Sequence, residues 1–195
     1  RRNGAAPGDG LVADVDHSHL TRRRQVRGDR LRRGSGTGRR DYLVEGGSQG
    51  FTRLKTMLYA EPKTAHALFE KLTRAAIVQI EEQIAAGAHA AQVFESWLGE
   101  LGREDLEEFS FPYLAKIAAA IRKTGVPSIL FSTGTTGHVE RMATLGFDVI
   151  SVDWRTPIQE VRARLPGVAV QGNYDSTILF GPTEVAVERA VQVAK

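Results

Sequence analysis

The alternation of apolar strands and amphipathic helices from residue 42 onward predicts an α/β fold with a parallel sheet. Four short apolar runs, at 89–94, 127–132, 147–152 and 168–172, are typical of buried strands. Segments with helical spacing separate them, and strands that alternate with helices form parallel sheets covered by those helices. The last two strand–helix repeats span only about 20 residues each, a spacing that favours a barrel.

Helices are expected between these strands. The segment "EPKTAHALFEKLTRAAIVQIEEQIAAG" has apolar residues at helical spacing, Pro62 near its start and Gly87 at its end. Further helices are expected at 112–125, 138–146, 157–167 and 182–195. A doubly wound sheet stays possible, but no G-x-G-x-x-G follows any strand, and "GTTGH" (134–138) lacks the Lys-Ser/Thr of a phosphate-binding loop.

The composition restricts the classes of protein to which the chain can belong. Its 195 residues suffice for one domain with a sizeable core, and 42% hydrophobic with 25% charged residues is ordinary for a soluble globular protein. The lack of cysteine excludes disulfides, thiolate metal sites and cysteine nucleophiles. With no His pair at ligand spacing, a zinc site is not supported. No apolar run approaches a membrane span of about 18 residues and no signal peptide is recognisable, so we expect a cytoplasmic protein.

Charge is distributed unevenly along the chain. Residues 1–40 hold eleven Arg and four Asp, a balance of +7, with much Gly and neither Lys nor an aromatic residue. Clustered Arg neutralises phosphates, which would make this segment a nucleic-acid-binding arm. Its low apolar content is also typical of a disordered leader. A third interpretation is that the segment is not native, because a GC-rich gene translated in another reading frame gives a similar Arg/Gly-rich sequence. We therefore divide the chain into an Arg/Gly-rich segment, 1–41, that is disordered or not native, and a folded part, 42–195.

Polar and aromatic residues collect where the predicted strands end. The groups are Glu95-Ser96-Trp97, Thr133 with His138, Asp153-Trp154, and Asn173-Tyr174-Asp175. Ligands of parallel α/β folds bind beyond the carboxyl ends of the strands, so these groups are expected to converge on one face. Each has a structural alternative: Ser96 may be read as a loop cap, Asp153 and Asn173 as helix caps, and His138 as a structural residue.

Several motifs of the folded part resemble those of the uroporphyrinogen decarboxylase family. They are "YLVEGGS" (42–48), "MLYAEP" (57–62), "QIAAGAHAAQVFESWLGELG" (83–102), "FPYLAKI" (111–117), "GFDVISVDW" (146–154) and "VQGNYD" (170–175). They follow the family's order and spacing and cover nearly all of 42–195. Several separate motifs in register are far more specific than any one of them alone.

The resemblance implies a (β/α)₈ barrel, commonly a homodimer, that uses no metal or organic cofactor. The implied reaction removes the carboxyl groups of four acetate side chains of uroporphyrinogen III and gives coproporphyrinogen III for haem biosynthesis. The Tyr of "YLVEGG" is Tyr42 and the Ser of "FES" is Ser96; in the family these residues line the cleft and hydrogen-bond the substrate. Phe94 is expected to border the same cleft. Ser96 would position a substrate carboxylate and would not act as a nucleophile.

Two motifs of the family have no counterpart in this sequence, and both bear on how many βα units of the barrel are expected. "RRGSGTGRRD" (32–41) replaces the family's strand before the Tyr, and the late histidine motif would lie beyond Lys195. We therefore expect an incomplete barrel of about four to five βα units. Three alternatives stay open: an inactive barrel fragment, a corrinoid-type barrel methyltransferase (whose usual thiolate zinc site the lack of cysteine disfavours), and a basic nucleic-acid-binding protein acting through residues 1–40.

Overall fold

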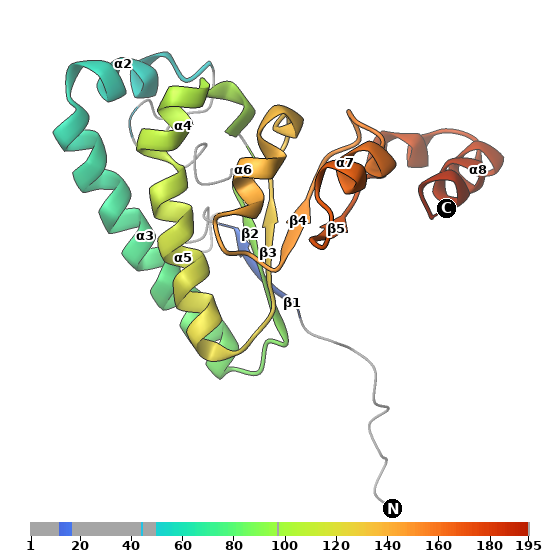
Figure 1. Ribbon diagram of the computed structural model, residues 1–195, viewed down its shortest axis with the longest axis horizontal. Coiled ribbons are helices and arrows are strands. Elements are labelled where there is room, and N and C mark those ends of the chain that lie inside the picture. Colours follow the sequence, from blue (N-terminus) through green and yellow to red (C-terminus); the bar gives the residue numbers. More distant parts are fainter. Residues whose placement is uncertain (1–11, 17–43, 45–49, 97, 195) are drawn as a thin grey trace, which may run out of the picture.

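Five parallel strands form one sheet in the computed structural model, which describes residues 12–16, 44, 50–96 and 98–194 (Figure 1). The strands are β1 (Val12–Asp16), β2 (Ala90–Phe94), β3 (Ser128–Phe131), β4 (Val149–Ser151) and β5 (Ala169–Gln171). The four strands predicted from the sequence are confirmed as β2 to β5. Strand β1 was not predicted, because its segment "VADVD" contains two acidic residues and lies within the Arg/Gly-rich part of the sequence. The other residues of 1–41 lie outside the described residues, so the division of the chain at residue 41 stays a prediction.

The order of the strands separates a barrel from a doubly wound sheet. Neighbours in the sheet are also neighbours in sequence, from β1 to β5 without a reversal. A doubly wound sheet reverses its strand order at a switch point, and the described strands contain none. The connections between parallel strands are right-handed. When each connection leads to the next strand on the same side, as here, all the connecting helices lie on the same face of the sheet. The part of the barrel seen in the structure therefore has one face covered by helices and one face without them.

The sheet is strongly curved about its uncovered face. Gln171 on β5 donates a side-chain hydrogen bond to Gln92 on β2, with 3.4 Å between Nε2 and Oε1. Strands three positions apart in a flat sheet are separated by about 14 Å, too far for two upright glutamine side chains to meet. The contact therefore requires the sheet to curl, as the wall of a barrel does.

The helices confirm most of the predicted pattern. They are α2 (Thr52–Ala60), α3 (Pro62–Ala85), α4 (Arg103–Phe109), α5 (Phe111–Thr124), α6 (Val139–Ala143), α7 (Ile158–Arg164) and α8 (Thr183–Ala194). Helices α3 and α5 lie side by side along the sheet (Figure 1). Helices α2 and α4 were not predicted. Neither has a side-chain N-cap, and α4 is a seven-residue, mostly charged segment without a clear apolar period.

The core lies between the covered face of the sheet and the helices. Alternate strand residues point into it: Val93 on β2, Leu130 on β3 and Ile150 on β4 are fully buried. They join one cluster with apolar residues of the helix layer, including Phe69, Ile80, Leu114, Ile117, Met142 and Val161. Each such side chain contributes about 1.5–3 kcal/mol when it leaves water. The core therefore holds the strands in place without using the residues that point to the uncovered face.

A polar contact joins the amino ends of two neighbouring strands. The backbone N–H and the hydroxyl of Ser128 both donate to Oδ2 of Asp148, at 2.8 and 2.7 Å. These hydrogen bonds hold the pKa of the Asp148 carboxyl below its ordinary value, because they favour the charged form. The contact lies at the end of the sheet opposite the strand exits, where barrels carry stabilising residues.

The segment after β5 is held mainly by its own contacts. The Tyr174 hydroxyl donates to the backbone carbonyl of Ala186 in α8 at 2.9 Å. Asp175 caps the 3₁₀ turn η3 (Ser176–Phe180), accepting from the amide and the hydroxyl of Thr177. This segment exposes several large apolar side chains, namely Leu179, Phe180, Val185, Val187 and Val191.

Candidate functional site at the carboxyl ends of the strands

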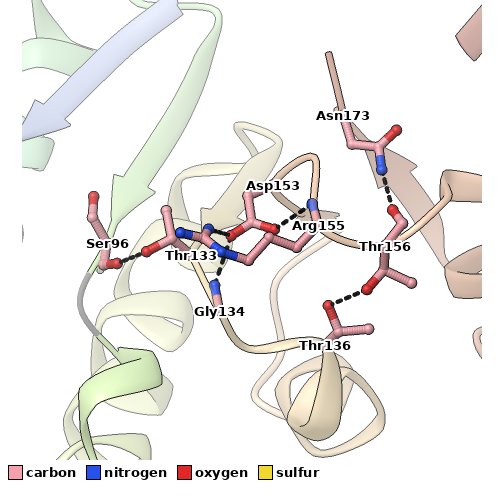
Figure 2. Close-up of polar contacts among 8 residues, drawn as sticks. All are labelled: Ser96, Thr133, Gly134, Thr136, Asp153, Arg155, Thr156 and Asn173. Atoms are coloured by element: carbon pink, nitrogen blue, oxygen red, sulfur yellow. Dashed lines mark hydrogen bonds and ion pairs between the residues drawn. The ribbon is translucent and has the colours of Figure 1, made fainter. Parts of the chain in front are cut away.

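The strand register places four polar residues in one row. Phe94 pairs with Phe131 across β2 and β3, and the same row continues through Ser151 to Gln171. Side chains two residues further along each strand lie on the same face of the sheet, one row closer to its carboxyl edge. That next row consists of Ser96, Thr133, Asp153 and Asn173, and we call it the polar row (Figure 2). The predicted convergence of the strand ends is confirmed for these four residues.

Hydrogen bonds connect the loops that follow the strands. The Thr133 hydroxyl donates to the backbone carbonyl of Ser96, and so ties the end of β3 to the end of β2. Thr156 donates through its hydroxyl to that of Thr136 at 2.9 Å, and Asn173 donates through its side-chain amide to the carbonyl of Thr156. The ends of β2, β3, β4 and β5 are thus joined in a continuous series of contacts (Figure 2).

Asp153 is the most connected member of the polar row. The residue is 5% exposed, and its carboxylate accepts the backbone N–H of Gly134 at 2.7 Å and that of Arg155 at 3.1 Å. It also accepts from Nη1 of Arg155, which forms an ion pair with it. A buried carboxylate is stable when it is paired and hydrogen-bonded, and Asp153 meets both conditions. The carboxylate therefore fixes the loop after β3 and the Arg155 side chain together.

A pocket of about 180 Å³ opens beside this carboxylate. Gly99, Glu100, Thr133, Gly134 and Arg155 line it. Gly99 belongs to the 3₁₀ turn η1 (Leu98–Glu100), and a Cβ placed on it would lie 2.8 Å from the carbonyl oxygen of Thr133 and 3.0 Å from that of Gly134. The turn after β2 therefore packs directly on the loop after β3, and the pocket depends on the missing side chain at position 99.

The predicted binding residues Ser96 and Phe94 share the uncovered face of the sheet. Both are half-buried and alternate with the buried Val93 and Glu95. Phe94 contacts Phe131 edge-on, with ring centroids 5.4 Å apart. The Ser96 hydroxyl points away from Thr133 (Figure 2) and forms no hydrogen bond among the described residues. Both side chains are thus placed where a ligand above the strand ends would meet them, and their role in binding stays a prediction.

The other expectations from the sequence are partly wrong and partly outside the described residues. Tyr42 and Trp97 lie outside the described residues, so the structure says nothing of their side chains. The helix-capping interpretation is wrong for Asp153 and Asn173, because their side chains bond to loops and α7 begins after Pro157. The carbonyl of Ser96, not its hydroxyl, makes the contact with Thr133. His138 directly precedes α6 and has no bond to the polar row.

Sequence analysis missed four contributors to this site: Gly99, Gly134, Arg155 and Thr156. Glycine in a loop carries no side-chain chemistry, so a close backbone approach cannot be recognised without the neighbouring strand. Arg155 carried a weak signal, because it directly follows the Asp153-Trp154 pair at a strand exit. Its guanidinium lies 4.7 Å from the ring centroid of Trp154.

The described residues show no arrangement for a metal ion or a membrane span. No group of three His, Asp or Glu side chains among them is placed to bind a metal. No helix in the same part of the chain is both long and apolar enough to cross a membrane.

The sheet order, the single covered face and the polar row define a barrel-type α/β protein with a candidate site at the carboxyl ends of the strands. The sequence profile described as "Uroporphyrinogen decarboxylase (URO-D)" matches residues 40–195. The chain belongs to the uroporphyrinogen decarboxylase family.

Relatives from distant organisms match the same part of the chain. A uroporphyrinogen decarboxylase of Anaeromyxobacter dehalogenans (strain 2CP-C) is 82% identical over 154 residues, which are 79% of this chain and 44% of the relative. A chloroplastic uroporphyrinogen decarboxylase of Arabidopsis thaliana is 43% identical over 158 residues, 79% of this chain and 40% of the relative. One from Geobacillus kaustophilus (strain HTA426) is 40% identical over 153 residues, 78% of this chain and 44% of the relative. The chain thus spans less than half the length of these curated relatives.

Proposed function

We propose that this chain acts in the decarboxylation of uroporphyrinogen to coproporphyrinogen. The observation that carries the proposal is the family match over residues 40–195, with 82% identity to a relative of that name. The substrate bears eight carboxylates around a flexible macrocycle, and the reaction removes four of them as carbon dioxide. The uncovered face of the sheet, with its polar row at the strand ends, suits such a ligand because barrels bind substrates there.

The chemistry assigns different tasks to the residues of this face. Protonation of a pyrrole carbon turns the ring into an electron sink, and the bond to the carboxyl carbon then breaks with release of carbon dioxide. The resulting methylene takes up a proton, and the ring carbon releases the proton it had gained, so that one proton is consumed overall. The protein must hold the ring, orient the reacting acetate and supply the proton. In this proposal the paired rings of Phe94 and Phe131 contact the macrocycle, and the Ser96 hydroxyl donates to a carboxylate. The edge-on contact of the two rings and the direction of the Ser96 hydroxyl, away from Thr133, support these roles. Tyr42 is proposed as a second hydrogen-bonding residue of the cleft.

The test uses this chain and a full-length chimera. In the chimera, the 154 matched residues of this chain replace their counterpart in the Anaeromyxobacter dehalogenans relative. Each protein is incubated with uroporphyrinogen III under reducing conditions, and the products are separated by carboxyl number after oxidation. We expect the chimera to form porphyrins with seven down to four carboxyls. A chimera that is folded but leaves the substrate intact would contradict the proposed function of these residues.

We also propose that the full-length protein is a cytoplasmic homodimer. Family members are commonly dimers, and exposed apolar side chains such as Phe180 and Val187 are of the kind that protein contacts cover. Analytical ultracentrifugation of the chimera tests this assembly. A monomer at micromolar concentration would overturn it.

A further inference from the structure

The Arg155 side chain reaches back over the sheet from the loop after β4. Figure 2 shows its guanidinium beside Asp153 and near Thr133, on the side of the polar row that leads to Ser96. The same side chain lines the pocket between the turn after β2 and the loop after β3. A cation is thereby placed beside the face to which the cleft residues Ser96 and Phe94 belong.

Asp153 orients this guanidinium but leaves most of its donors unused. The guanidinium has five N–H donors in a planar fork, and the contact with Asp153 uses Nη1. Asp153 in turn accepts two backbone N–H groups, so its negative charge is shared among three partners. The Arg155 side chain is 53% exposed, whereas its partner is almost fully buried. No other described residue accepts from the remaining N–H donors of Arg155, which leaves them available to a ligand.

The pocket has the size of a single carboxylated arm. Its volume of about 180 Å³ is enough for one carboxylated arm and too small for a tetrapyrrole ring. An acetate arm, with one methylene and a carboxylate, is the shorter of the two arms that uroporphyrinogen carries. Arginine is suited to such a group because its fork matches a carboxylate in a bidentate geometry.

We propose that Arg155 is a substrate-binding residue that holds an acetate carboxylate of the porphyrinogen in this pocket, with Asp153 as its positioning residue. The inference deepens the proposed function and rests on it. Glu100, which lines the same pocket, carries the opposite charge and weakens the binding of an anion there. Removing the charge of Arg155 should therefore weaken the binding of this carboxylate, whereas removing the charge of Glu100 should strengthen it.

The experiment measures binding of two probes to the full chain. Uroporphyrin carries four acetate and four propionate arms, whereas coproporphyrin keeps the propionates and has methyl groups in place of the acetates. Dissociation constants are obtained from quenching of tryptophan fluorescence, at low and at physiological salt. The variants are R155Q, R155K and E100Q, with R162Q as a charge-matched control on the exposed surface of α7.

We expect R155Q to weaken uroporphyrin binding about 5-fold to 20-fold relative to R162Q, the range of one partly exposed charge-assisted hydrogen bond. R155K should fall between R155Q and the unchanged chain, because lysine keeps the charge but lacks the fork. E100Q should tighten binding about 2-fold, and both effects should shrink with salt. With coproporphyrin, R155Q and R162Q should differ by less than 2-fold.

Four results would overturn the inference, and only one of them would also contradict the proposed function. Equal affinity of R155Q and R162Q for uroporphyrin would remove Arg155 from the binding site and leave the proposed function intact. Equal losses with both probes would show a propionate contact and overturn the acetate assignment. An unchanged chain that binds neither probe would overturn the inference together with the proposed function of this chain. If circular dichroism shows that R155Q is unfolded, E100Q carries the test, and weaker binding by E100Q would overturn the proposal.

Discussion

The Thr133 hydroxyl donates a hydrogen bond to the backbone carbonyl of Ser96, while the Ser96 hydroxyl points away from this contact. The structural link between β2 and β3 therefore does not use the Ser96 side chain. Removing that hydroxyl leaves the link in place, whereas removing the Thr133 hydroxyl breaks it. The two residues thus allow the support of the site to be separated from its contact with the substrate.

Ser96→Ala in the full-length chimera should lower turnover about 10-fold to 100-fold, the range of one lost positioning contact. The urea midpoint of the chimera should stay unchanged. Turnover is measured from the rate of product formation with uroporphyrinogen III. Thr133→Val is the companion variant, and we expect it to lower the urea midpoint because the bond to the Ser96 carbonyl is lost. An unchanged rate for Ser96→Ala would remove its hydroxyl from the cleft.

Gly99→Ala should destabilise the full chain by about 1–3 kcal/mol, because its Cβ would press on the Thr133 carbonyl at 2.8 Å and force the two loops apart. Gly137→Ala is the matched control, since a Cβ there meets nothing within 4 Å. Urea denaturation followed by circular dichroism gives both free energies of unfolding. Equal effects of the two substitutions would show that the loops tolerate a side chain at position 99.

Asp153→Ala should lower the free energy of unfolding by about 1–3 kcal/mol, because the N–H of Gly134 loses its carboxylate acceptor and the ion pair with Arg155 is broken. Glu160→Ala removes an exposed carboxylate of α7 as a control and should change stability by less than about 0.5 kcal/mol. The measurement is again urea denaturation at neutral pH. A small effect at Asp153 would mean that the loops find other partners.

Asp148→Asn should reduce the dependence of stability on acid pH. The folded pKa of Asp148 is lowered from 3.8 by its hydrogen bonds to Ser128, so its contribution is fully present above that value. It is lost as the pH falls through the lowered folded pKa. The difference in stability between the two proteins should thus be constant from about pH 5 to 7 and shrink below about pH 4. Urea midpoints between pH 3 and 7 test this, and a constant difference throughout would contradict the assignment.

The acid dependence will not vanish in that variant. Ion pairs with Arg141 and Arg164 lower the pKa values of Glu107 and Glu140 in the same direction. Both pairs lie on the surface, where solvent screening keeps such contributions small.

Much of the fold followed from the sequence because its signals are local. Helical spacing, Pro62 and Gly87 predicted α3, which the structure places at Pro62–Ala85. The four apolar runs predicted β2 to β5, since short apolar strands that alternate with helices are typical of parallel sheets. Helix α4 was not predicted, because its seven mostly charged residues show no helical spacing of apolar residues. The structure buries Leu106 and Phe109 of this helix, and that burial stabilises it.

The sequence by itself determined the family, the alternation of strands and helices, and the polar residues at each strand exit. The tertiary structure decided which of these residues meet. The register aligned Ser96, Thr133, Asp153 and Asn173 in one row, and the short spacing between strand ends brought Arg155 to the pocket. Such contacts join residues up to 79 positions apart in sequence. A local residue pattern indicates which face of a strand is buried, but the strand that lies beside it and the curvature of the sheet depend on how all strands and helices pack together.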